Sequence, residues 1–116
     1  MAIQIKRVYD PASKQDGYRI LVDRLWPRGM TKERARIDLW LKEIAPSTAL
    51  RNHYHRGDIL WADFKAAYLL ELDANKLAIQ QLLEIGREKQ ITLIYSVRDT
   101  EKNHAVILKE FLLSCH

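Results

Sequence analysis

Residues 91–95 read Ile-Thr-Leu-Ile-Tyr, a nearly continuous apolar run rich in β-branched side chains. This pattern is typical of a central strand in a parallel sheet, because both faces of such a strand are covered and no polar alternation is needed. A helical pattern over 77–88 precedes the run, and another begins near Thr100. The helix–strand–helix order predicts an α/β domain with one right-handed parallel crossover.

The remaining elements are expected around this strand. Apolar and polar residues alternate over 3–9, and a second strand is expected over 18–24. A third extended segment is expected over 37–46. Helical segments should begin after the caps Thr31 and Ser47. The stripe Trp61, Phe64, Tyr68 and Leu72 has helical spacing and predicts core packing. We therefore expect one compact domain over 1–116, with a small parallel or mostly parallel sheet flanked by helices.

The composition narrows the classes of protein to which the chain can belong. The chain has 116 residues, of which 47% are hydrophobic and 29% charged, as in an ordinary soluble domain. No apolar run approaches the roughly 20 residues that span a bilayer, so no membrane partner is expected. The single cysteine, Cys115, cannot form a disulfide within the chain and favours the reducing cytoplasm.

No cofactor or metal is expected. The chain has neither a P-loop nor a Gly-x-Gly-x-x-Gly motif. His53 and His55 are two positions apart and therefore point to different sides of a helix, with no cysteine nearby.

Positive charge is concentrated in the first half of the chain. The net charge is +4, and residues 1–60 hold 12 Lys and Arg against 7 Asp and Glu. Two explanations stay open. The excess is either a solvated basic face or a local field for an anionic partner.

The stretch 22–29, Val-Asp-Arg-Leu-Trp-Pro-Arg-Gly, follows the second strand and carries unusually costly residues for a turn. Arg24 and Arg28 can each offer a planar fork of donors to phosphate or carboxylate. Ligands of open α/β sheets gather at the carboxyl ends of the strands. Polar residues also follow the other expected strands, so we expect all of them to meet at one cleft.

These residues form two candidate groups. Ligand binding is predicted for Arg24, Trp26, Arg28, Ser47, Ser96, Arg98 and Asn103, with Trp26 as a wall of the pocket. Proton transfer or polarisation is predicted for Asp23, Asp99 and His104. Arg24, Arg28, Arg98 and the start of the last helix would form the anion cradle.

Each candidate also has a structural explanation. Asp23 and Arg24 could pair with Arg98 and Asp99 across adjacent strand ends. Asp99 or Thr100 could serve only as a helix cap, and His104 could satisfy a backbone carbonyl. The sequence leaves these alternatives open.

Four motifs together resemble the YeaO-like family, small bacterial proteins classed as a domain of unknown function. The motifs are D-R-L-W-P-R-G at 23–29, L-W-L-K-E-I-A-P-S at 39–47, W-x-x-F-x-x-x-Y-x-x-E-L at 61–72 and Y-x-x-x-D-x-x-x-N-H-A at 95–105. The resemblance implies a compact cytoplasmic α/β domain but supplies no activity. One departure is at 96–99, where relatives often have a small residue and a lysine before the aspartate.

Two functions follow as expectations. The first is a binding or enzymatic domain for a small anionic compound such as a phosphate or nucleotide. The second is a basic nucleic-acid or protein-interaction module without turnover, for which the candidates are Lys32, Arg34, Arg36, Arg51 and Arg56. The sequence does not decide between them, nor does it give the oligomeric state.

Overall fold

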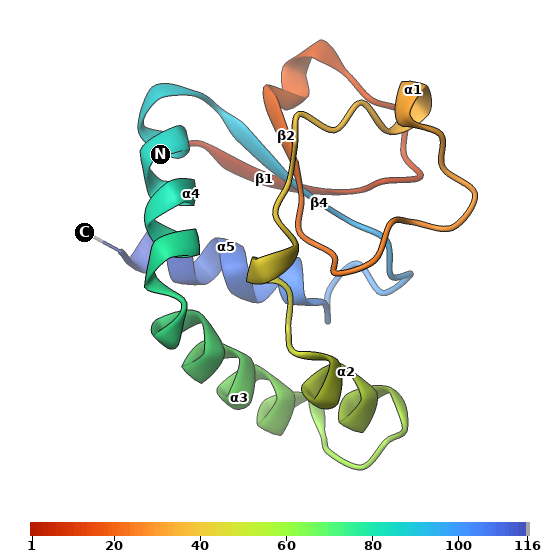
Figure 1. Ribbon diagram of the computed structural model, residues 1–116, viewed down its shortest axis with the longest axis vertical. Coiled ribbons are helices and arrows are strands. Elements are labelled where there is room, and N and C mark those ends of the chain that lie inside the picture. The colour runs from red at the N-terminus through yellow and green to blue at the C-terminus, as the bar shows by residue number, and fades with distance from the viewer. Residues whose placement is uncertain (116) are drawn as a thin grey trace.

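The computed structural model describes residues 1–115, which form a four-stranded parallel sheet (Figure 1). The strands are β1 (Ile3–Arg7), β2 (Tyr18–Leu21), β3 (Leu39–Trp40) and β4 (Ile91–Tyr95), in the order β1–β4–β2–β3. All three pairings are parallel, and every residue of β4 is buried. The predicted central parallel strand is therefore confirmed, and so is the α/β class.

Five α-helices and two short 3-10 turns complete the described part of the chain. They are η1 (Lys14–Asp16), α1 (Lys32–Ala35), η2 (Lys42–Ile44), α2 (Thr48–His55), α3 (Trp61–Ala74), α4 (Lys76–Glu88) and α5 (His104–Ser114). The expected caps are present, because the Thr31 and Ser47 side chains accept hydrogen bonds from the Arg34 and Leu50 N–H groups. None of the helices within residues 1–115 has the length and apolar character needed to cross a membrane.

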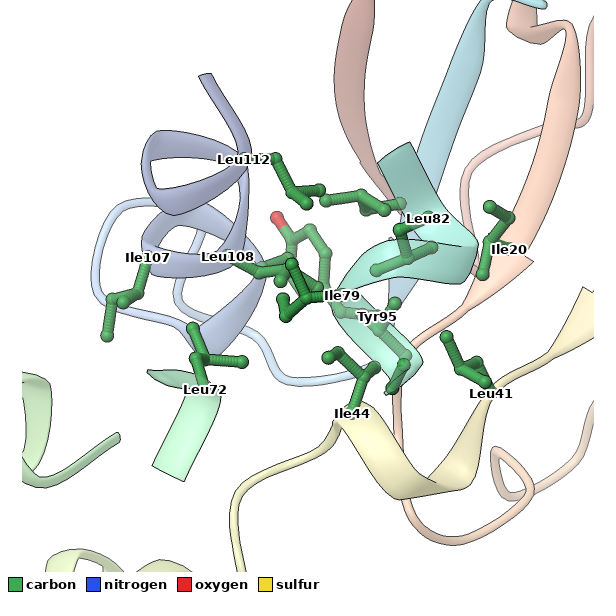
Figure 2. Packing of buried hydrophobic residues seen from close by; sticks show 14 of the residues in the cluster. Ile20, Leu41, Ile44, Leu72, Ile79, Leu82, Tyr95, Ile107, Leu108 and Leu112 are labelled. Carbon is green, nitrogen blue, oxygen red and sulfur yellow. The ribbon is translucent and has the colours of Figure 1, made fainter. Parts of the chain in front are cut away.

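The main core lies between one face of the sheet and helices α3, α4 and α5 (Figure 1). Figure 2 shows Leu82 of α4 and Leu108 and Leu112 of α5 packed near Ile20 and Tyr95 of the sheet. This side-by-side arrangement buries the stripes that the helical spacing predicts.

The other face of the sheet is covered by the long segment between β2 and β3. Leu21 and Ile94 pack there against Met30 and Ala35, with Trp26 at the margin. The helices therefore lie mostly on one face, and an extended segment with one short helix covers the other.

A buried ionic cluster, which we call the Asp16 network, lies where β2 begins. The Asp16 carboxylate accepts hydrogen bonds from the Lys6 ammonium at 3.1 Å, the Ser13 N–H at 2.9 Å and the Arg19 guanidinium. Arg19 also donates to the Ala35 carbonyl at 2.8 Å and 3.1 Å, which ties β2 to α1. The network thus joins β1, β2 and α1.

Several element boundaries differ from the sequence prediction. The strand expected over 18–24 ends at Leu21, and the one expected over 3–9 ends at Arg7. The third extended segment pairs over only two residues before η2 begins. The last helix begins at His104 rather than near Thr100, because the Asp99 carboxylate accepts from the N–H groups of Glu101 and Lys102 and closes a turn there. The Asn103 side chain then caps α5 by accepting from the Val106 N–H.

Candidate functional site

A cavity of about 500 Å³ opens at the carboxyl edge of the sheet. Its walls come from the segments after β1, β2 and β4, from the residues that precede α2, and from helices α2, α3 and α5. Because all four strands are parallel, their carboxyl ends share one edge, and the segments that follow β2 and β4 meet there (Figure 1). The volume is in the ordinary range for small-molecule pockets.

Side chains from distant parts of the chain line this cavity together. Arg24 and Arg98 both contribute to the lining, so the convergence expected from parallel strand ends is present. The basic lining residues are Arg24, Arg28, Arg51, Arg98 and Lys102. They outnumber the two carboxylates that line the cavity, Asp23 and Asp99. The cavity is therefore electropositive.

Two arginines hold the loops around the cavity through hydrogen bonds to backbone carbonyls. Arg7 donates to the carbonyls of Val97 at 2.9 Å and Ser96 at 3.1 Å, which holds the segment after β4. Arg24 donates to the carbonyls of Ala45 at 3.1 Å and Pro46 at 3.4 Å, which holds the segment before α2. Arg24 is thus half-buried and partly committed to backbone carbonyls.

Arg28 and Arg98 differ from Arg24. Both side chains are exposed at the cavity, and neither forms an ion pair within residues 1–115. The Arg28 backbone is anchored, because its carbonyl accepts a hydrogen bond from the Tyr9 hydroxyl at 2.8 Å. Two guanidinium groups at the cavity thus keep their donors available.

A buried polar group forms part of the lining. The Ser96 hydroxyl donates to Asp23 Oδ2 at 2.6 Å, and His104 Nε2 lies 3.0 Å from Asp23 Oδ1. The same Nε2 lies 3.1 Å from the Val22 carbonyl oxygen. Because a carbonyl can only accept, Nε2 carries the proton and directs it to Val22. Asp23 Oδ1 is buried and has no hydrogen bond within residues 1–115.

The electropositive surroundings act on a neighbouring histidine. Partial burial lowers the pKa of His55, and the positive charges of Arg51 and His104 lower it further. His55, Arg51 and His104 come from α2 and α5 and all line the cavity.

Three further residues predicted for ligand binding make structural hydrogen bonds, and two of them also line the cavity. Asn103 lines the cavity, but its side chain caps α5 and donates to the Asp99 carbonyl at 2.9 Å. Trp26 lines the cavity and donates its indole N–H to the Met30 carbonyl at 2.7 Å. Ser47 lies outside the lining; its N–H and hydroxyl both donate to Glu71, at 2.8 Å and 2.6 Å.

The structure distinguishes among the structural explanations that the sequence left open for these residues. Within residues 1–115, Asp23 and Arg24 do not pair with Arg98 and Asp99, since Asp23 contacts Ser96 and His104 instead. Asp99 closes the turn before α5 instead of capping the helix, and the N–H groups of Lys102 and Glu101 lower the pKa of its carboxyl. His104 does satisfy a backbone carbonyl, that of Val22.

Sequence reasoning missed an aromatic wall. Tyr54, Trp61 and Phe64 all line the cavity, with ring centroids 4.7 Å apart for Tyr54–Phe64 and 5.6 Å for Trp61–Phe64. The predicted core stripe is confirmed at Phe64, Tyr68 and Leu72, which are buried. Only its first turn reaches the cavity, and helical spacing alone gives no signal for that.

The site offers little to a metal ion. Within residues 1–115, no three His, Cys, Asp or Glu side chains lie close enough together to hold one. The arrangement is instead suited to binding an anion with guanidinium groups and an uncharged ring with aromatic side chains.

Comparison with known proteins gives a consistent family match. Residues 2–115 match the family model described as the inactive DUF488-N3 subclade. The relative named Uncharacterized protein YeaO, from Escherichia coli strain K12, is 48% identical over 114 residues, covering 98% of this chain and 99% of the relative. Uncharacterized proteins of Mycobacterium bovis and Mycobacterium tuberculosis are 33% identical over 110 residues, covering 95% of this chain and 92% of each relative. No solved structure matches the chain.

Proposed function

The chain belongs to the YeaO-like family, within the inactive DUF488-N3 subclade, and from this premise we propose that it binds a small phosphate-bearing ligand without converting it. The observation that carries the proposal is the pair Arg28 and Arg98. These two exposed guanidinium groups come from segments after different strands and share one cavity. Their donors have no carboxylate partner within residues 1–115.

The phosphate would be bound mainly by charge. A hydrogen bond to a charged group contributes about 1.5–3 kcal/mol, so Arg28 and Arg98 together provide useful affinity. Lys102 and Arg51 add positive charge at the same cavity. The N-terminus of α5, which begins at His104, adds the positive end of the helix dipole.

The residues predicted for proton transfer have different roles in this proposal. Asp23 and His104 form a buried polar pair that contacts the ligand, whereas the Asp99 carboxylate is used in the turn before α5. The subclade is described as inactive, which favours binding over catalysis. The proposed setting is the cytoplasm, because a chain with one cysteine suits a reducing compartment.

Thermal unfolding with added anions tests the proposal. Inorganic phosphate, ribose 5-phosphate and ribonucleoside monophosphates are compared with chloride at matched ionic strength, and at least one phosphate compound should raise the melting temperature. Titration calorimetry should then show that Arg28→Ala and Arg98→Ala each weaken binding by about tenfold or more. Their own stability should stay within about 0.5 kcal/mol of wild type, because both side chains are exposed.

Arg87→Ala is the matched control, because Arg87 is an exposed arginine on α4 that does not line the cavity. It should bind the same compound as wild type does. The proposal fails if no phosphate compound raises the melting temperature, or if Arg87→Ala weakens binding as much as Arg98→Ala. Binding only to polynucleotides, with steep salt dependence, would favour the basic nucleic-acid module instead.

A further inference from the structure

The aromatic wall is a second, independent feature of the cavity. Tyr54 comes from the end of α2, and Trp61 and Phe64 come from the first turn of α3. Phe64 is buried, but Tyr54 and Trp61 are only partly covered and face the cavity. Large aromatic side chains contribute most when they are covered, so these two leave contact area for a ligand.

The three rings support one another. Tyr54 and Trp61 have centroids 5.8 Å apart, and each packs on Phe64 at interplanar angles of 30° and 24°. Phe64 packs in turn on Tyr68, whose hydroxyl donates to the Ile44 carbonyl at 2.7 Å. The wall is therefore continuous with the core and in place before a ligand arrives.

An isolated phosphate ion would not use this wall. A cavity of about 500 Å³ accepts a ligand much larger than one phosphate group. Guanidinium groups bind the phosphate, whereas an aromatic face binds best to another flat ring. A ligand that uses both features carries a phosphate and a planar ring.

The buried polar pair adds a third requirement. Asp23 lines the cavity at 8% exposure, and its Oδ1 accepts no hydrogen bond within residues 1–115. Oδ1 itself is covered, so a ligand reaches this residue only at the exposed 11% of its side chain, and an N–H placed there would relieve part of the cost of burying a carboxylate with few donors. Ser96 and His104 already occupy fixed places beside this carboxylate. The ring therefore carries N–H donors, as every nucleobase does.

We propose that the ligand is a nucleoside monophosphate whose base packs against Tyr54 and Trp61 while its phosphate binds Arg28 and Arg98. This inference rests on the proposed phosphate-binding function and names the class of ligand for the same cavity. It assigns the base to the α2–α3 side of the cavity and the phosphate to the segments that follow β2 and β4. The Asp23 carboxylate accepts an N–H of the base.

Titration calorimetry with matched compounds tests the assignment. The four ribonucleoside monophosphates are compared with ribose 5-phosphate, which lacks the ring, and phenyl phosphate, which has a ring without N–H groups. The preferred monophosphate should bind at least tenfold more tightly than ribose 5-phosphate, because stacking of one base contributes about 1–3 kcal/mol. Phenyl phosphate should lie between the two.

Variants of the aromatic wall test which side chains make the monophosphate bind more tightly than ribose 5-phosphate. Trp61→Leu keeps an apolar side chain in the first turn of α3. It should remove most of the difference in affinity between the monophosphate and ribose 5-phosphate, and the affinity for ribose 5-phosphate should stay unchanged. Tyr54→Leu should act in the same direction, and thermal unfolding confirms that both variants are folded. Leu60→Ala is the control, because Leu60 is 75% exposed, precedes Trp61 and does not line the cavity.

The outcomes separate the two proposals. If ribose 5-phosphate binds as tightly as every monophosphate, this inference falls while phosphate binding stands. The inference also falls if Trp61→Leu and Tyr54→Leu are both folded and still bind the monophosphate more tightly than ribose 5-phosphate by the same factor as wild type. If neither ribose 5-phosphate nor any monophosphate binds, the proposed function itself falls and takes this inference with it.

Discussion

Asp16 and Asp23 flank the same strand, β2, and both are buried, yet their surroundings differ. Asp16, at 4% exposure, accepts hydrogen bonds from Lys6, Ser13 and Arg19. Asp23, at 8% exposure, accepts one from Ser96 and leaves Oδ1 without any within residues 1–115. The carboxylate with a complete set of donors serves the fold, and the incomplete one faces a cavity. Burial alone therefore does not distinguish the two acids, whereas their hydrogen-bond partners do.

The largest expected effect is on the Asp16 network. Asp16→Ala leaves the Arg19 guanidinium buried without its carboxylate, so the free energy of unfolding should fall by about 3–5 kcal/mol. Urea unfolding followed by circular dichroism measures the change. A cost below about 1 kcal/mol would mean that the network contributes little, and the contrast with Asp23 would be lost.

Acid should weaken the same network. Burial alone would raise the pKa of Asp16, but the Ser13 N–H, Lys6 and Arg19 together hold it below its ordinary value. Above about pH 5 the carboxyl is ionised in folded and unfolded chains alike, and the stabilisation is complete. As pH falls further, the unfolded chain takes up a proton before the folded chain does, and stability is lost.

Unfolding free energies from pH 6 to pH 3 test this for wild type and Asp16→Asn. The difference between the two proteins should be constant at the upper end and should shrink below about pH 5. Curves that stay parallel down to pH 3 would contradict the lowered pKa of Asp16.

A smaller effect on stability is expected at Asp23 than at Asp16. Asp23→Asn keeps an oxygen that can accept from the Ser96 hydroxyl but places a buried amide NH2 beside His104 Nε2–H, so the free energy of unfolding should fall by about 1–3 kcal/mol, less than for Asp16→Ala. Affinity for a bound monophosphate should fall by about tenfold in calorimetry, because the acceptor for the base is lost. A large loss of stability with unchanged affinity would make Asp23 a structural residue like Asp16.

The sequence was most informative where one residue type determines local structure. The β-branched run over 91–95 predicted the central strand because only a doubly covered strand lacks polar alternation. Thr31 and Ser47 predicted helix starts because their hydroxyls accept from nearby N–H groups. The parallel order of the strands then implied that Arg24, Arg28 and Arg98 would meet.

Contacts between distant residues could not be predicted in the same way. Nothing in the local pattern around Asp23 indicates that His104 and Ser96 would be its neighbours rather than Arg98. The stripe that begins at Trp61 identified the face of α3 that packs, but not that its first turn extends past the core to the cavity. Ser47 had the chemistry of a ligand-binding residue, and Glu71 of α3 binds both of its donors.

Arg7 and Arg24 hold the backbone around the cavity through hydrogen bonds to carbonyl groups. Guanidinium stays charged throughout the pH range in which proteins are folded, and carbonyl acceptors carry no proton to lose. The rim should therefore keep one shape from mildly acid to alkaline solution, whatever happens to the histidines beside it. A ligand that binds at this rim should therefore find a preformed site. The backbone should shift by less than about 1 Å between the free and the ligand-bound protein.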